Sequence, residues 1–211
     1  MRTETPWGPW EPATPAEVAA LFAQLRVPWW IAGGYAVEMA VGHAFREHAD
    51  IDVSLLRRDQ LAAQEALPSW EWWAADPPGT LRRWLPGEVL PSDVHDIWCR
   101  PGEGEPWRLQ IMLEEAEEPG ESGEYEGVVW VSHRDRRVRR PIAEIGLAGP
   151  DGIPRLAPEI QLLYKAKSPR PKDERDFDAL LSVLSPAQRA WLERAVETTY
   201  GPHPWAARLK G

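Results

Sequence analysis

The chain has 211 residues, of which 43% are hydrophobic and 27% charged, a composition typical of a globular protein with a sizeable core. Its formal net charge of −9 argues against duplex nucleic acid as a partner, because such binding needs a basic surface. The absence of an 18-residue apolar run or a secretory signal, together with a single cysteine, Cys99, leads us to expect a cytoplasmic protein with no membrane partner.

The first part of the chain is expected to alternate helix and strand. Thr14, Pro15 and Glu17 form a capping box that predicts a helix over about 15–26. Later elements follow from apolar periodicity and turn residues. They are a strand over 27–32, a helix over 35–41, a strand over 50–56 and a helix over 58–67.

The middle of the chain is expected to be rich in strands, and its last third helical. The candidate strands are 70–74, 94–100, 107–113, 128–132 and 142–145. The candidate helices are 158–167, 171–184 and one that starts with the capping box at Ser185. A strong turn signal at 149–152 separates the two groups. We therefore predict an α/β domain over residues 1–150 and a small helical portion over 151–211.

Asp50 and Asp52 are the residues best suited to metal chemistry. Side chains alternate along a strand, so both carboxylates should share a face about 6–7 Å apart while Ile51 points the other way. Two carboxylates can hold Mg²⁺, whose coordination is completed by water and substrate phosphates. Taken alone the pair is a weak signal, since strand ends often carry acids.

A Gly-Gly turn precedes this pair and makes the signal more specific. Gly33 and Gly34 follow an expected buried strand and open a helix, 17 residues before Asp50. Glycine lets the backbone approach a ligand closely, and the amides of a helix start attract phosphate oxygens. Together the turn and the aspartates predict a site for a nucleoside triphosphate such as ATP.

Several segments then point to a known family. They are residues 30–38, 42–48, 50–52, 95–101, 107–113, 157–167 and 170–173. These segments resemble the aminoglycoside adenylyltransferase-like branch of the polymerase-β-type nucleotidyltransferases. The resemblance implies an α/β (α+β) fold with a mixed sheet flanked by helices. It also implies transfer of a nucleoside monophosphate, such as AMP, from ATP or another triphosphate to an acceptor hydroxyl as pyrophosphate leaves.

The resemblance also implies residue roles. Gly33 and Gly34 would hold the triphosphate, and Asp50 and Asp52 would be catalytic ligands of Mg²⁺. Arg46 would contact a phosphate.

His48 would help Arg46 to organise the site. The alternative for both residues is a structural role, in which they form salt bridges to the metal-site carboxylates or cap the turn.

Lys165 is the expected triphosphate contact within a local basic cluster. The cluster also contains Lys167, Arg170 and Lys172. The alternative is a solvated helix end, where cations are favoured by the helix dipole. Nearby Asp173 and Asp176 are expected to pair with Lys172 and Arg175 as helix-surface charge.

One position departs from the family pattern. Gln110 stands where relatives carry a third carboxylate that serves as general base, and an amide cannot accept the proton. Glu114 lies on the same strand face but about 13 Å further along. Asp96, on the preceding strand, is the other candidate. Gln110 therefore leaves open a catalytically impaired nucleotide-binding module instead of an enzyme.

The acceptor is expected to be a small hydroxylated molecule, with aminoglycoside-like cations fitting the acidic balance. Residues 114–126 contain seven carboxylates and no base, although a solvated loop is the plainer interpretation. The 13 Trp side chains could wall the acceptor pocket. A toxin-type transferase acting on a macromolecule is a second possibility, and the net charge disfavours tRNA. The sequence indicates no oligomeric state.

Overall fold

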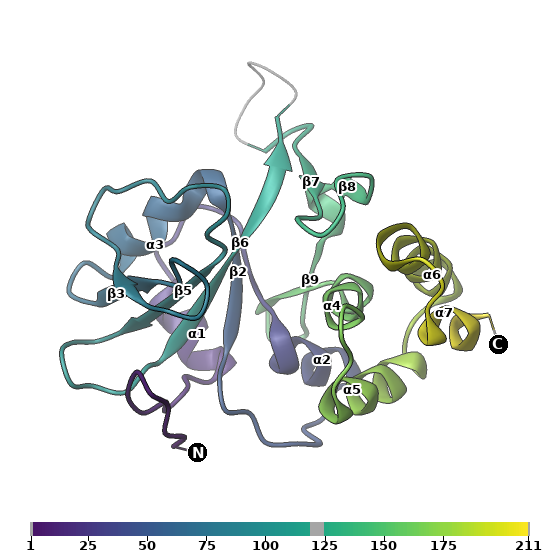
Figure 1. Ribbon diagram of the computed structural model, residues 1–211, viewed down its shortest axis with the longest axis horizontal. Helices are drawn as coiled ribbons and strands as arrows, with labels where there is room; N and C mark the ends of the chain where they lie inside the picture. Colours follow the sequence, from purple (N-terminus) through teal and green to yellow (C-terminus); the bar gives the residue numbers. More distant parts are fainter. Residues whose placement is uncertain (1, 119–124, 211) are drawn as a thin grey trace.

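The computed structural model describes residues 2–118 and 125–210 and contains a mixed sheet flanked by helices, as the sequence predicts (Figure 1). Strands run in the order β4-β3-β5-β6-β2-β1-β10-β9, and β7 and β8 extend from β6. The strands are β1 (Trp29–Ile31), β2 (Asp52–Leu56), β3 (Glu71–Ala74), β4 (Arg82–Arg83), β5 (Asp96–Arg100), β6 (Leu109–Glu117), β7 (Val129–Val131), β8 (Arg139–Pro141), β9 (Gly146–Ala148) and β10 (Pro154–Leu156).

Helices cover both faces of this sheet. They are α1 (Pro15–Leu21), α2 (Gly33–Val41), α3 (Gln60–Ala66), α4 (Pro158–Lys165), α5 (Pro171–Leu181), α6 (Pro186–Tyr200) and α7 (Pro204–Leu209). The predicted capping boxes at Thr14 and Ser185 are both present. None of these helices, within the described residues, is long and apolar enough to cross a membrane.

Alternation along the strands divides the core in two. Ile31 and Val53 point to one side and pack with apolar residues of α1 and α3. Trp30 points to the other side, where it joins a core built mainly from α4 to α7. In Figure 1 these four C-terminal helices gather beside α2, at the end of the sheet opposite β3. The loop from α2 to β2 therefore lies between the sheet and the C-terminal helices.

Some elements differ from the sequence-based expectation. The prediction of a strand over 142–145 is wrong, because Ile142–Glu144 forms a 3₁₀ turn. β4, β8 and β10 were not expected, since short strands rich in Arg and Pro form through pairing with neighbours and carry little pattern of their own. β10 runs parallel to β1, with Ile31 opposite Arg155. The sheet thus extends past residue 150, and the division there stays a prediction.

Candidate functional site

The Gly-Gly turn lies directly against β2. β1 and β2 are antiparallel neighbours, and the Ala32 amide donates to the Asp52 carbonyl at 2.8 Å. Gly33 has φ +62°, and a Cβ at this position would lie 1.9 Å from Asp52 Oδ2. Position 33 therefore requires glycine for two reasons, its left-handed backbone and its contact with the carboxylate.

The second glycine makes room for two polar side chains. A Cβ at Gly34 would lie 2.1 Å from Arg46 Nη2 and 2.5 Å from His48 Nδ1. The Gly33 amide already donates to Gln161 Oε1 at 2.7 Å. The two glycines thus fit protein groups around the site, and the Gly33 amide is engaged before any phosphate arrives.

Asp50 and Asp52 share a cavity of about 500 Å³ with a group of cations. Asp50 lies just before β2, and Asp52 is its first residue. The other lining residues are Gly33, Gly34, Arg46, Gln110, Gln161, Tyr164, Lys165, Lys167, Ser168, Arg170, Lys172 and Asp173. The fold therefore brings together all the expected site residues except His48, which stands behind Arg46.

The Asp52 carboxylate in this cavity is poorly compensated by nearby positive charge. Desolvation and the neighbouring charge of Asp50 raise the pKa of Asp52 to about 7. A divalent cation would remove this cost, and carboxylate oxygens are the donors that Mg²⁺ prefers. In the described part of the chain no three His, Cys, Asp or Glu side chains are grouped to hold a metal. An ion at Asp50 and Asp52 would therefore take its other ligands from phosphate and water.

Arg46 and Lys165 belong to a buried ion network. Arg46 forms two hydrogen bonds to Asp176, at 2.8 and 3.0 Å. The Lys165 Nζ lies 2.8 Å from Asp176 Oδ2 and 3.1 Å from Asp173 Oδ1. Burial opposes the ionisation of Asp173, but hydrogen bonds from Arg170 and Lys165 outweigh it and lower its pKa to about 2.

This network corrects three expectations. Lys165 is no solvated helix end, because its side chain is only 8% exposed. Arg46 does not bridge the metal-site carboxylates. Asp173 and Asp176 are fully buried and do not pair with Lys172 and Arg175, because α5 packs against α2 and turns them inward.

Glu38 holds the loop that carries Arg46. Its Oε1 accepts the amides of Phe45 and Arg46 at 2.9 and 3.0 Å, and its Oε2 lies 3.0 Å from His48 Nε2. His48 also stacks on Tyr35, with ring centroids 4.1 Å apart, and burial lowers its pKa. His48 and Glu38 thus position the loop. Glu38 was missed in the sequence, where its only signal is an acid on a buried helix.

A third carboxylate, Asp96 of β5, lies next to Gln110 but does not line the cavity. Gln110 lies beside Asp52 in the parallel β2–β6 pair, and its Nε2 donates to Asp96 Oδ1 at 2.9 Å. Burial raises the pKa of Asp96 to about 6, although the Gln110 hydrogen bond lowers it. Glu114 is buried and accepts hydrogen bonds from Ser54, Trp130 and Tyr164. Asp96 is therefore the carboxylate in contact with Gln110, one strand away from it.

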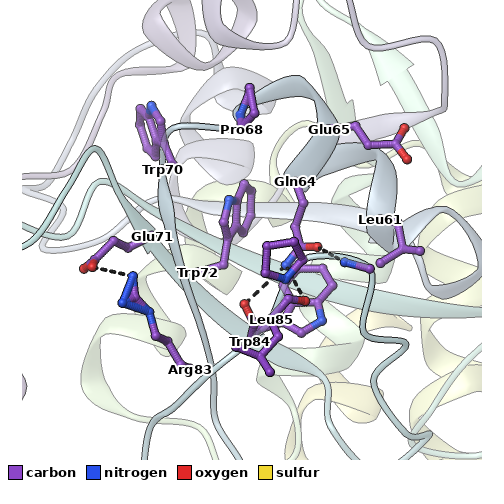
Figure 2. A pocket seen from close by; sticks show the side chains of 12 residues that line it. Leu61, Gln64, Glu65, Pro68, Trp70, Glu71, Trp72, Arg83, Trp84 and Leu85 are labelled. Atoms are coloured by element: carbon purple, nitrogen blue, oxygen red, sulfur yellow. Dashed lines mark hydrogen bonds and ion pairs between the residues drawn. The ribbon is translucent and has the colours of Figure 1, made fainter.

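Neither the tryptophans nor the described residues of the acidic run line the cavity that holds Asp50 and Asp52. No Trp lines the 500 Å³ cavity. Figure 2 shows Trp70, Trp72 and Trp84 around a separate cavity of about 540 Å³ beside α3. In the acidic run, Glu115 pairs with Arg57, and residues 119–124 lie outside the described residues.

Comparisons with known proteins support the expected relationship. Residues 16–70 match the family model described as aminoglycoside-2''-adenylyltransferase, a segment that includes both glycines and both aspartates. The comparison with curated proteins gave no match.

Two solved structures have a similar fold, each with a TM-score of 0.50. One is lincosamide antibiotic adenylyltransferase LnuA bound to lincomycin, which is 17% identical, with 80% of this chain and 95% of that chain covered. The other is ANT(2'')-Ia in complex with adenylyl-2''-tobramycin, which is 14% identical, with 85% and 93% covered. The resemblance to aminoglycoside adenylyltransferase-like nucleotidyltransferases is confirmed.

Proposed function

We propose that this chain is a nucleotidyltransferase that moves AMP from ATP to a hydroxyl group of a small antibiotic acceptor. The observation that carries the proposal is the cavity in which Asp50 and Asp52 face Lys167 and Lys172. Carboxylates suit the metal of a triphosphate, and lysines suit its phosphates. When bound at the two aspartates, Mg²⁺ supplies charge neutralisation at the phosphoryl oxygens and lowers the pKa of the acceptor hydroxyl.

Lys167 and Lys172 contact the triphosphate in this proposal. The sequence favoured Lys165, but its ammonium is held by Asp173 and Asp176. Lys167 and Lys172 line the same cavity, and neither forms an ion pair with a described residue. Their charges are therefore available to the phosphates. Lys165 instead links α4 to α5.

Asp96 acts as general base in this proposal. The acceptor oxygen attacks the α-phosphorus, the bond to the pyrophosphate oxygen breaks, and pyrophosphate leaves with the bonding electrons. The hydroxyl proton moves to Asp96, whose carboxylate is oriented by the Gln110 amide at 2.9 Å. A base with a pKa of about 6 is ionised at neutral pH yet still basic enough to accept this proton.

The acceptor class comes from the two similar structures, one bound to lincomycin and the other in complex with adenylyl-2''-tobramycin. Transfer of radiolabelled AMP from ATP to lincomycin and tobramycin, with and without Mg²⁺, tests the proposal directly. Asp50→Asn serves as the inactive control. We expect labelled antibiotic only from the wild-type chain in the presence of Mg²⁺.

The alternative is a nucleotide-binding module without turnover, and Gln110 is the observation that favours it. Isothermal titration with MgATP separates the two. Tight MgATP binding with no label transferred to either antibiotic would support the module and contradict the enzyme.

A further inference from the structure

A row of side chains crosses the sheet from the catalytic aspartate to the sheet edge. The strand register pairs Asp52 with Gln110, and Gln110 with Trp98. It then pairs Trp98 with Trp73, and Trp73 with Arg83. Residues paired across neighbouring strands share a face of the sheet, so these five side chains lie on one face.

This face is partly open, whereas the opposite face is sealed. Trp73 and Trp98 are half-buried, as is Gln110. On the other face Ile97 and Cys99, the sequence neighbours of Trp98, are both 0% exposed. Two indole rings are thus partly exposed on the side of the sheet that carries Asp52, with their Nε1 atoms buried.

Two buried tryptophans pack against these rings. Trp98 packs edge-on against Trp10, with centroids 4.9 Å apart at 77°, and against Trp107, at 5.6 Å and 71°. Trp73 packs against Trp107 in the same way, at 6.2 Å and 85°. Trp10 and Trp107 are 2–3% exposed and fix the positions of both rings. A rigid aromatic surface of this kind favours stacking of a ring-shaped ligand.

The charges along the row differ at its two ends. Asp96 lies beside Trp98 at the catalytic end, because it precedes Trp98 by two residues on the same strand. At the far end the Arg83 guanidinium lies 5.8 Å from the Trp73 ring centroid, and its side chain is 55% exposed. Glu71 is neutralised there by Arg83 and Arg100. A ligand along the row would place an amine near Asp96 and a neutral or anionic group near Arg83.

The length of the row sets the size of the ligand. Neighbouring strands lie about 4.8 Å apart, so Trp98 is about 10 Å and Trp73 about 14 Å from Asp52. One sugar-sized ring with its hydroxyl at Asp52 would cover Gln110 and end near Trp98. Only a second ring would reach the aromatic surface of both tryptophans.

We propose that Trp98 and Trp73 form the acceptor platform, which stacks against the second ring of an acceptor with at least two rings. The inference rests on the proposed function and assigns its acceptor specificity to these two residues. The first ring lies over Gln110 and Asp96, where its hydroxyl reacts.

Fluorine NMR of the full chain labelled with 5-fluorotryptophan tests the platform. Resonances are assigned with single Trp→Phe variants, and tobramycin, lincomycin and the single-ring glucosamine are titrated in the presence of MgATP. We expect the Trp98 and Trp73 signals to shift with an antibiotic and to move little with glucosamine. The signals of Trp70 and Trp84, in the separate cavity of Figure 2, should stay in place.

Kinetics provide the second measurement. Trp98→Ala should raise the KM for the antibiotic about tenfold, with kcat and the MgATP dissociation constant changed by less than about twofold. Trp98→Phe should restore most of the affinity, and Trp70→Ala is the matched control. Shifts confined to Trp70 and Trp84 would overturn the platform but leave the proposed function standing. Binding of MgATP with no binding of either antibiotic would overturn the small-antibiotic acceptor itself and the platform with it.

Discussion

Substitution of Gly33 by alanine, compared with a control glycine, would test whether MgATP binding depends on the packing of Gly33 against Asp52. The residue has φ +62°, and its new Cβ would lie 1.9 Å from Asp52 Oδ2. The left-handed backbone alone costs an alanine about 1–2 kcal/mol. The contact is far shorter than any real Cβ contact, so the Asp52 carboxylate must move away from Asp50. We expect the variant to lose stability and to lose MgATP binding.

Gly42→Ala is the matched control for this substitution. Gly42 also has a left-handed φ, +90°, but nothing lies within 4 Å of its would-be Cβ. The Gly42→Ala substitution should therefore lower Tm by about 2–8 °C through the backbone cost alone and leave MgATP binding intact. Thermal melts and isothermal titration of both variants measure the two effects. A Gly33→Ala chain that binds MgATP as tightly as the wild type would refute the packing of Gly33 against Asp52 as a requirement of the site.

Four further outcomes follow from the site. Asp96→Asn should lower kcat by about 10²–10⁴ in the transfer assay, with an unchanged MgATP dissociation constant. Because the pKa of Asp52 is raised to about 7, Mg²⁺ affinity by titration calorimetry should fall as pH drops from 8 to 6, when this carboxyl takes up a proton. Asp176→Asn leaves Arg46 buried without its partner and should cost about 3–5 kcal/mol in urea unfolding. The double substitution of Lys167 and Lys172 by alanine should raise the KM for ATP and leave Tm unchanged.

The acidic half of the site was predictable because its signals are local. Gly33, Gly34, Asp50 and Asp52 lie within 20 residues, and both carboxylates line one cavity although Asp50 lies just before β2. The cores under α1 and α3 follow from the same periodicity. Their prediction needed no knowledge of how distant segments pack.

The remaining features depend on long-range packing. Arg46 and Asp176 are 130 residues apart, and their pairing requires α5 to dock on α2. Asp96 approaches Gln110 only because of the register between β5 and β6, which the sequence does not specify. A sequence shows that a residue is charged, but its partner is decided by the fold. For this reason the sequence predicts Lys165 as a triphosphate contact, whereas the fold pairs it with Asp173 and Asp176.

The ion network around Asp176 has a consequence for any attempt to shorten the chain. Asp50 and Asp52 come from a segment before residue 60, whereas Lys165, Lys167, Lys172 and Asp176, the counter-ion of Arg46, all come from beyond residue 150. A fragment ending near residue 150 would keep the acids and lose every one of these cations. It would also leave the guanidinium of Arg46 without its counter-ion. The aspartates and the cations of the cavity thus come from opposite ends of the chain, and neither part would form the site without the other.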